Sequence, residues 1–423
     1  MLFIKIVDII RIGITNGGEF LAKKPVDQLA WPVQSILISI LFISNFFPFY
    51  ITLVTFAVIF IFLSMLGLIG PQHQNEVPTS IWIFIAYSAV ISFVYQNWAG
   101  FGISIAYILI ALYFNYYQQV IQPYFVEELL NIALIASFII FIFATMEYLN
   151  WVPEWDYSFI SPEINRVHNG RAEATFANPN YYAMMLEFFF FIALYKFMRT
   201  TKLRKKFVFL FIGFCNLFAT IYTGTRTSLL VVIGTLFVFY YIMGYKKIAV
   251  GTSLTGTITV LIAIKSGLLP RFEDLGFAFE DRFVIWDIAL KGLRDNFWFG
   301  QGPLTYLMIW QDYGEKYTQH AHNIILDTLL SYGVIGTGIL AIPIASLARN
   351  INKMRQYPIL RRRLALICSF GSVVLLHGMF DLTIFWLQTA FLFLFIVLAS
   401  NNMLKEVETH PELQGNLSDY ARD

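Results

Sequence analysis

Residues 128–147 run ELLNIALIASFIIFIFATME, with eighteen uncharged and mostly apolar residues between two glutamates. A helix that spans a bilayer needs about 20 predominantly apolar residues. At a rise of 1.5 Å per residue, such a helix extends about 30 Å, which is the thickness of the hydrocarbon core. The stretch therefore predicts a membrane-spanning helix.

A similar composition extends over the whole chain of 423 residues. Hydrophobic residues make up 58% and charged residues 13%, whereas a typical soluble protein is about 25% charged. This excludes an ordinary globular protein, and a net charge of +2 is too small to indicate nucleic-acid binding. Cys215 and Cys368 both lie in apolar stretches, so neither a disulfide framework nor a cysteine metal site is expected.

A scan for apolar segments of this kind finds twelve. They are residues 30–48, 50–70, 80–96, 98–116, 128–147, 181–197, 207–222, 228–244, 247–264, 323–347, 364–380 and 383–399. The predicted fold is all-α: a polytopic transmembrane helical bundle of about 12 spans, in which a helical extracytoplasmic loop joins spans 9 and 10.

The N-terminal residues indicate the orientation of this bundle. Lys5, Asp8 and Arg11 recur every three residues among apolar ones. Residues 2–14 are therefore expected to form a helix on the membrane surface and not a cleavable signal. The lysine pair that follows at 23 and 24 indicates that this side is cytoplasmic, because cytoplasmic loops are rich in Lys and Arg.

With the N-terminus inside, twelve alternating spans place the basic segments of the chain in the cytoplasm. These segments are Lys196 to Lys206, Lys246 to Lys247 and Arg349 to Arg363, so the positive-inside rule is obeyed. Two long segments, 148–180 and 265–321, then lie outside.

The predicted domain organisation follows from this topology. Residues 1–400 form one transmembrane domain, and residues 401–423 form a cytoplasmic tail. Within the larger outer segment, Glu280 to Arg294 has the amphipathic pattern of a helix.

Two classes of function compete for such a chain. A transporter carries ionisable residues near the bilayer midplane. Glu187 and Asp327 are the ionisable residues well inside a predicted span, and both lie about 7 to 10 Å from its outer end. Because the polar residues concentrate at the outer face, we favour an enzyme that acts there on a substrate with a lipid tail. A transporter or flippase is the alternative.

The hexapeptide Thr223 to Ser228, TGTRTS, forms a short turn between two spans on the predicted outer side. Arg226 and the amides at the start of the next helix can together bind one phosphate group. The alternative role for Arg226 is to anchor the helix end at the membrane interface.

His320 and His322 lie where the larger outer segment enters the tenth span. The positive end of a helix dipole opposes an added proton, so both imidazoles are expected to be neutral and able to accept one. Residues two apart diverge on a helix, and no third ligand cluster is close in sequence, so no metal site is expected. Helix capping is the alternative role for each histidine.

Further cations lie in the smaller outer segment, residues 148–180. Arg166, His168 and Arg171 add positive charge on the outer side, which favours an anionic substrate. Arg166 and Arg171 are therefore candidate substrate-binding residues.

Two pairs of residues are spaced four apart, which places their side chains on one helical face. For Arg282 and Trp286, a stack of the guanidinium on the indole is the structural alternative to a role in binding. His377 and Asp381, at the outer end of the eleventh span, are expected to form a structural hydrogen-bonded pair and not a catalytic one.

Taken in order, five motifs of the chain resemble the O-antigen ligase and polymerase superfamily. They are TGTRTS at 223–228, RFVIW at 282–286, GQGP at 300–303, HNIIL at 322–326 and YGVIG at 332–336. Upstream, residues 170–180, which end in Asn-Pro-Asn, also look like that family's stretch before a helix. Each motif is short, and the resemblance lies in their order.

The resemblance implies a metal-independent, inverting glycosyltransferase of the bacterial inner membrane, without a cofactor and with its active site on the extracytoplasmic face. Its donor would be an undecaprenyl pyrophosphate-linked glycan, and its acceptor a hydroxyl of a glycan, a lipid or a protein. Arg226 and Arg282 would hold the pyrophosphate, and His322 would orient or deprotonate the acceptor. Arg171 and His320 are weaker candidates for substrate binding.

Members of this superfamily differ in their acceptors. Polymerases join lipid-linked repeat units of a surface polysaccharide, and ligases attach the glycan to the lipid A core or to a protein. The motifs do not separate the two; we prefer a polymerase because it requires no particular outer membrane. A flippase and a polysaccharide chain-length regulator are the expected protein partners.

The predicted topology is testable with reporter fusions. A fusion at residue 300 should report the outer side of the membrane, and a fusion at residue 355 should report the cytoplasm, because one span separates them. Both reporters on the same side would overturn the placement of every candidate site residue.

Overall fold

The computed structural model describes residues 29–70, 77–149, 151, 170–267 and 275–410. Over these residues the chain is helical and contains no strand, so the predicted all-α class is confirmed. The predicted surface helix at 2–14 and the candidate residue Arg166 lie outside the described residues.

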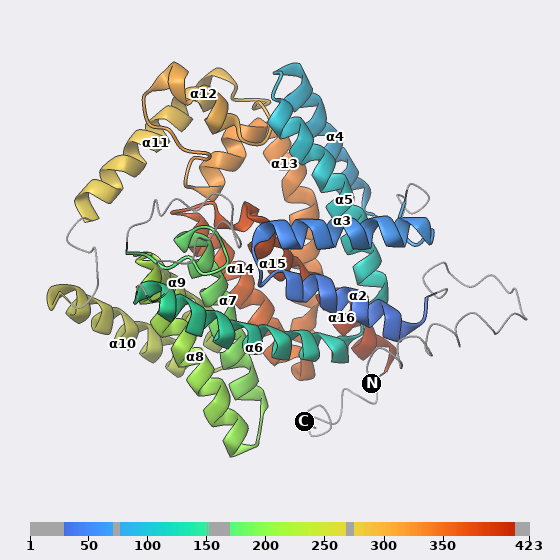
Figure 1. The fold of residues 1–423 in the computed structure, drawn as a ribbon, viewed down its shortest axis with the longest axis vertical. Coiled ribbons are helices and arrows are strands. Elements are labelled where there is room, and N and C mark those ends of the chain that lie inside the picture. Colours follow the sequence, from blue (N-terminus) through green and yellow to red (C-terminus); the bar gives the residue numbers. More distant parts are fainter. Residues whose placement is uncertain (1–28, 71–76, 150, 152–169, 268–274, 411–423) are drawn as a thin grey trace, which may run out of the picture.

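Each of the twelve predicted apolar segments coincides with a helix (Figure 1). The helices are α2 (Trp31–Ser44), α3 (Phe49–Met65), α4 (Thr79–Val94), α5 (Trp98–Val120), α6 (Pro123–Tyr148), α7 (Pro179–Arg199), α8 (Leu203–Thr223), α9 (Ser228–Ile242), α10 (Lys246–Lys265), α13 (Ile324–Lys353), α14 (Arg361–Gly378) and α15 (Leu387–Leu398).

Seven helices in the described part of the chain are long and apolar enough to cross a membrane, when α15 is counted together with the helix that follows it. Four shorter apolar helices, α2, α3, α4 and α9, accompany them. The remaining predicted segment, α14, begins with three arginines, which explains its lower hydropathy. The chain is thus a multi-pass membrane protein.

Two further helices, α11 (Leu275–Asp295) and α12 (Thr305–Tyr313), form a cap at one end of the molecule, above α13 (Figure 1). The cap has a small hydrophobic core of its own, which consists of Ile285, Ile288, Ala289, Leu293, Tyr306, Ile309, Ala321 and Leu330. The helical loop predicted between the ninth and tenth apolar segments is therefore present.

The segment after residue 400, predicted as a polar tail, begins with a packed helix. This helix, α16 (Ser400–Thr409), is strongly amphipathic and buries Met403, Leu404 and Val407. The helix packs against α5, α6, α13 and α15, so the bundle extends about one helix further than expected.

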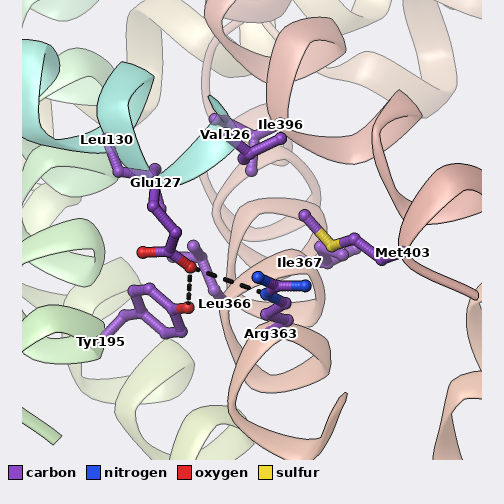
Figure 2. Close-up of a pocket in the computed structure, with 9 residues that line it drawn as sticks. All are labelled: Val126, Glu127, Leu130, Tyr195, Arg363, Leu366, Ile367, Ile396 and Met403. Atoms are coloured by element: carbon purple, nitrogen blue, oxygen red, sulfur yellow. Dashed lines mark hydrogen bonds and ion pairs between the residues drawn. The ribbon is translucent and has the colours of Figure 1, made fainter. Parts of the chain in front are cut away.

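A polar cluster ties three helix ends together at that end of the bundle. Figure 2 shows the Glu127 carboxylate of α6 between Tyr195 of α7 and Arg363 of α14. Lys196 lies 2.8 Å from the same carboxylate, and Arg199 also contacts it. Because a buried charge is costly unless it is paired, the cluster holds the start of α6, the end of α7 and the start of α14 at one level.

A second polar cluster lies at the opposite ends of the same helices. Asn180, at the start of α7, donates to Asp381, just beyond the end of α14. Sixteen residues of α7 separate Asn180 from Lys196, which corresponds to about 24 Å along the helix axis. The two clusters therefore lie at opposite ends of α7, and the candidate site residues lie near Asn180.

Helix α13 is broken at Gly333, whose backbone has φ 61° and ψ −173°. Residues 297–302, from the loop between α11 and α12, lie across the break. Four backbone hydrogen bonds join them: Gln301 and Gly302 donate to the Ser331 carbonyl at 3.1 and 2.7 Å, and Val334 and Ile335 donate to the carbonyls of Phe297 and Trp298 at 3.0 and 3.1 Å. The loop thus satisfies the backbone groups that the break exposes, as a membrane interior requires.

This crossing depends on glycine at three positions. A Cβ atom would lie 2.4 Å from the Ser331 carbonyl oxygen at Gly300, 2.1 Å from the Ser92 hydroxyl at Gly302, and 2.5 Å from the Phe299 nitrogen at Gly333. All three also have positive φ angles. The motifs GQGP and YGVIG are therefore the two sides of one backbone contact.

We expect the substitution Gly333→Ala to destabilise the protein. The backbone conformation at Gly333 is adopted almost only by glycine and disfavours alanine by about 1–3 kcal/mol, and overpacking against the loop adds about 1–3 kcal/mol. The measurement is the thermal unfolding midpoint in detergent. Gly338→Ala in the same helix is the matched control, because nothing lies within 4 Å of its Cβ position. Equal midpoints for the two variants would contradict the close crossing.

Candidate active site

The Asp381 carboxylate is the centre of the second polar cluster, the one that contains Asn180. It is 4% exposed. Its Oδ1 lies 2.8 Å from Nδ1 of His322 and accepts from the Leu382 amide at 2.8 Å, while its Oδ2 accepts from the Asn180 side chain. Burial raises the pKa of Asp381, but the hydrogen bond with His322 and the nearby imidazoles lower it by more. The net pKa lies well below the usual value for an aspartate, so the group is ionised.

The predicted pairing of Asp381 with His377 is wrong. Helix α14 ends at Gly378, so Asp381 no longer shares a helical face with His377. His377 instead lies 2.9 and 3.0 Å from the two carboxylate oxygens of Glu187 on α7, and both side chains are fully buried. Each group thereby gains the partner that a buried ionisable side chain needs.

His322 precedes α13 and is not helical. Its φ is 49°, and the following residue, Asn323, is the N-cap, with a side chain that accepts from the amides of Ile325 and Leu326 at 3.0 Å. The second ring nitrogen of His322, Nε2, lies 3.1 Å from the Thr318 hydroxyl. The expectation that both histidines lie within the first helical turn is therefore wrong, although they remain close to the helix N-terminus.

A second buried carboxylate holds the backbone beside His322. The Ala321 amide donates to Oδ1 of Asp327 at 2.8 Å, and Asp327 lies in the first turn of α13. A non-glycine residue with positive φ is uncommon and persists where its surroundings fix it. Asp327 and Asp381 together fix His322 in this conformation.

His320 lies on the other side of Asp381. Its Nε2 is 3.7 Å from Oδ1 of Asp381, its Nδ1 accepts from the His322 amide at 3.3 Å, and the two imidazole centroids are 4.4 Å apart. Burial lowers the pKa of His320 to about 4, even though Asp381 opposes the shift. His320 is therefore neutral at pH 7, because of its burial and not because of the helix dipole on which the sequence-based expectation rested.

His320, His322 and Asp381 form a group of metal-ligand type. One ligand atom from each lies within 4.8 Å of the others. From the sequence alone no metal site is expected, because residues two apart diverge on a helix. The left-handed backbone at His322 removes that obstacle, and Asp381 supplies the third group from 59 residues further along the chain.

Arg282, on α11, reaches the same cluster. Its Nε donates to the Phe380 carbonyl at 3.0 Å, one residue before Asp381. Burial lowers the pKa of Arg282 and the charge of Asp381 opposes this, but an arginine stays protonated. The alternative, a stack with Trp286, does not form, because the Trp286 ring meets Phe283 at 5.7 Å and Arg282 points toward α14.

Arg171 joins the TGTRTS turn to this cluster. Its Nε donates to the Thr223 carbonyl at 2.6 Å, and one terminal nitrogen donates to the side chains of Asn180 and Thr225 at 2.8 and 3.3 Å. Asn180 in turn donates to Asp381. Arg171, a weaker candidate from sequence, is thus linked to the Asp381 carboxylate through the single side chain of Asn180.

Arg226 lies in the same turn, directly after Thr225. The turn begins at Gly224, which ends α8 in a left-handed conformation with φ 58°, and Arg226 is partly buried. The N-cap residue of α9, Thr227, makes no side-chain capping bond. Arg171 anchors this turn to Asn180, which places Arg226 on the side of the bundle that carries His322.

Sequence reasoning missed the central role of Asp381 and the role of Asn180. Asn180 was interpreted only as part of a helix start, and Asp381 as a partner for the wrong histidine. The available signal was that both residues lie at predicted outer ends of spans, at the level of Arg226 and His322.

Residues 207–341 match a protein-family model described as O-antigen ligase. Arg226, Arg282, His320 and His322 fall within the matched region, and Arg171, Asn180 and Asp381 complete the cluster from outside it. None of the curated proteins compared with the chain matches it. The match supports a function of the O-antigen ligase or polymerase type. Residues 207–341 are thus similar to the O-antigen ligase family, and this match supports the resemblance to the O-antigen ligase and polymerase superfamily.

Proposed function

We propose that the protein is an inverting glycosyltransferase that moves a glycan from an undecaprenyl pyrophosphate-linked donor to an acceptor hydroxyl, at the extracytoplasmic face of the bacterial inner membrane. The observation that carries the proposal is the 2.8 Å contact between His322 Nδ1 and the buried Asp381 carboxylate, with Arg282 bonded to the preceding residue. It combines an oriented base with fixed cations.

His322 is the proposed base for the acceptor. When Nδ1–H donates to Asp381, the lone pair of the neutral ring is on Nε2, the nitrogen that lies 3.1 Å from the Thr318 hydroxyl. An acceptor hydroxyl bound on the Nε2 side of the ring, where the Thr318 hydroxyl lies, can transfer its proton to Nε2. Asp381 holds the ring in this tautomer and stabilises the imidazolium that forms, as in other carboxylate and histidine pairs.

The arginines are the proposed donor site. As the acceptor oxygen forms a bond to the anomeric carbon, the bond from that carbon to the pyrophosphate oxygen breaks on the opposite face, and the electron pair leaves with undecaprenyl pyrophosphate. Arg171, Arg226 and Arg282 stabilise the negative charge that develops on the leaving group. Because Arg282 is held through Nε, its terminal nitrogens are oriented for a phosphate.

These cations supply the charge stabilisation for which other enzymes use a metal ion, so we propose that the reaction requires no metal and no cofactor. Arg171 and His320 are the proposed further substrate-binding residues. Arg166 stays a candidate for the same role on the basis of its charge alone.

We propose that the acceptor is a second lipid-linked repeat unit, so that the enzyme polymerises a cell-surface polysaccharide. The family description favours the second candidate, a ligase that attaches the glycan to the lipid A core or to a protein. Neighbouring genes separate the two: a flippase, a chain-length regulator and several glycosyltransferases support a polymerase, whereas core-lipid synthesis genes support a ligase.

Purified protein should consume a lipid pyrophosphate-linked glycan in the presence of a chelator, and His322→Ala should lower the rate about 10²–10⁴-fold. Asp381→Asn should cause a similar loss, because the amide no longer stabilises the imidazolium. His410→Ala is the matched control, since His410 is exposed beyond α16. Full activity of normally folded His322→Ala would remove His322 from the mechanism.

Substitution of arginine by lysine tests the donor site. A compact ammonium cannot form the two-pronged contact of a guanidinium with a phosphate, so Arg226→Lys and Arg282→Lys should each weaken binding of an undecaprenyl pyrophosphate analogue. Arg294→Lys, at an exposed position on α11, and Trp286→Ala are the controls for the stability of the cap. Unchanged affinity in both lysine variants would instead support interfacial anchoring.

A further inference from the structure

We infer that His320, His322 and Asp381 form a binding site for a zinc-like divalent cation, and that its occupation blocks His322 as a base. The site itself rests only on the geometry of the three side chains, whereas the inhibition rests on the proposed function. The cation is a regulator of the site and takes no part in transfer.

The distances between the ligand atoms suit a small tetrahedral ion. Bonds of about 2.0–2.1 Å from zinc to nitrogen or oxygen place two ligand atoms roughly 3.4 Å apart. Oδ1 of Asp381 lies 2.8 Å from Nδ1 of His322 and 3.7 Å from Nε2 of His320. The two separations lie on either side of the required value, so small side-chain rotations complete the arrangement.

The surroundings suit a site with one open position. The side chains of Asp381, His320 and His322 are 6%, 13% and 24% exposed, so the group is sheltered but reachable. The second carboxylate oxygen of Asp381 is already held by Asn180, as ligands of metal sites usually are. Three protein ligands leave a fourth position for water.

The donor set selects the class of cation. Two imidazole nitrogens and one carboxylate suit Zn²⁺, Co²⁺ or Ni²⁺, whereas Mg²⁺ and Ca²⁺ prefer sites made of oxygen atoms. To bind through Nε2, His320 carries its proton on Nδ1 and gives up the 3.3 Å bond from the His322 amide. That bond is long for a hydrogen bond, so its loss costs little.

Occupation of the site changes the tautomer of His322. A cation on Nδ1 requires that nitrogen to be unprotonated, so the proton of the neutral ring lies on Nε2. Nε2 then donates, with the Thr318 hydroxyl at 3.1 Å as its acceptor, and no longer accepts a proton from a substrate. The cation and the base therefore compete for one imidazole.

The site is tested on full-length protein without a polyhistidine tag. Titration with Co²⁺ should give the visible absorption of a tetrahedral complex at one equivalent, and Zn²⁺ should displace it. His320→Ala and Asp381→Asn should each weaken Co²⁺ binding at least tenfold, whereas His410→Ala should bind as the wild type does. Absence of saturable binding, or equal binding in all four proteins, would overturn the site.

Inhibition is measured separately. Zn²⁺ should abolish transfer at one equivalent and a chelator should restore it, while the same concentration of Mg²⁺ has no effect. Zn²⁺ should also protect His322 from modification by diethyl pyrocarbonate, a readout that needs no donor. If Zn²⁺ binds but neither protects His322 nor abolishes transfer, the proposed inhibition is overturned. Transfer that requires Zn²⁺ would overturn the metal-free reaction and the inhibition together, and leave the site supported.

Discussion

The arrangement of the candidate site depends on one constraint, that the buried carboxylate of Asp381 must be hydrogen-bonded. Unpaired burial of a charge costs several kcal/mol. Asp381 meets the constraint with His322, Asn180 and the Leu382 amide, which come from three different segments. Arg282 donates to the carbonyl of Phe380, the residue before Asp381. The proposed base, His322, and the proposed donor-binding Arg282 are therefore both bonded to the segment Phe380 to Asp381.

The same constraint organises the interior of the bundle. The Glu127 carboxylate joins the ends of α6, α7 and α14 through three cations, and Glu187 joins α7 to α14 through His377. Contacts between apolar side chains allow two helices to shift along each other, since lipid is equally apolar. A shift of this kind would break the buried pairs of Glu127 and Glu187. Helix α7, which takes part in both pairs, therefore sets the registers of its neighbours.

The crossing at Gly333 applies the constraint to the backbone. A break in a helix exposes amides and carbonyls, and residues 297–302 satisfy them. This contact attaches the cap, and with it Arg282, to α13, whose start carries His322. The GQGP and YGVIG motifs are each uninformative alone, because they form the two sides of one backbone contact.

Hydropathy alone determined the helical class and all twelve apolar helices, because each helix in lipid must be built from a continuous apolar run. Residue type and position near span ends also indicate Arg226, His320 and His322 as candidate site residues, and the family resemblance adds Arg282. Only the tertiary structure decided which groups meet. Asp381 pairs with a histidine 59 residues away, since α14 ends before it and α7 supplies His377 with Glu187. The left-handed backbone at His322 is stabilised by Asp327 and Asp381 across the fold, and no local pattern records such contacts.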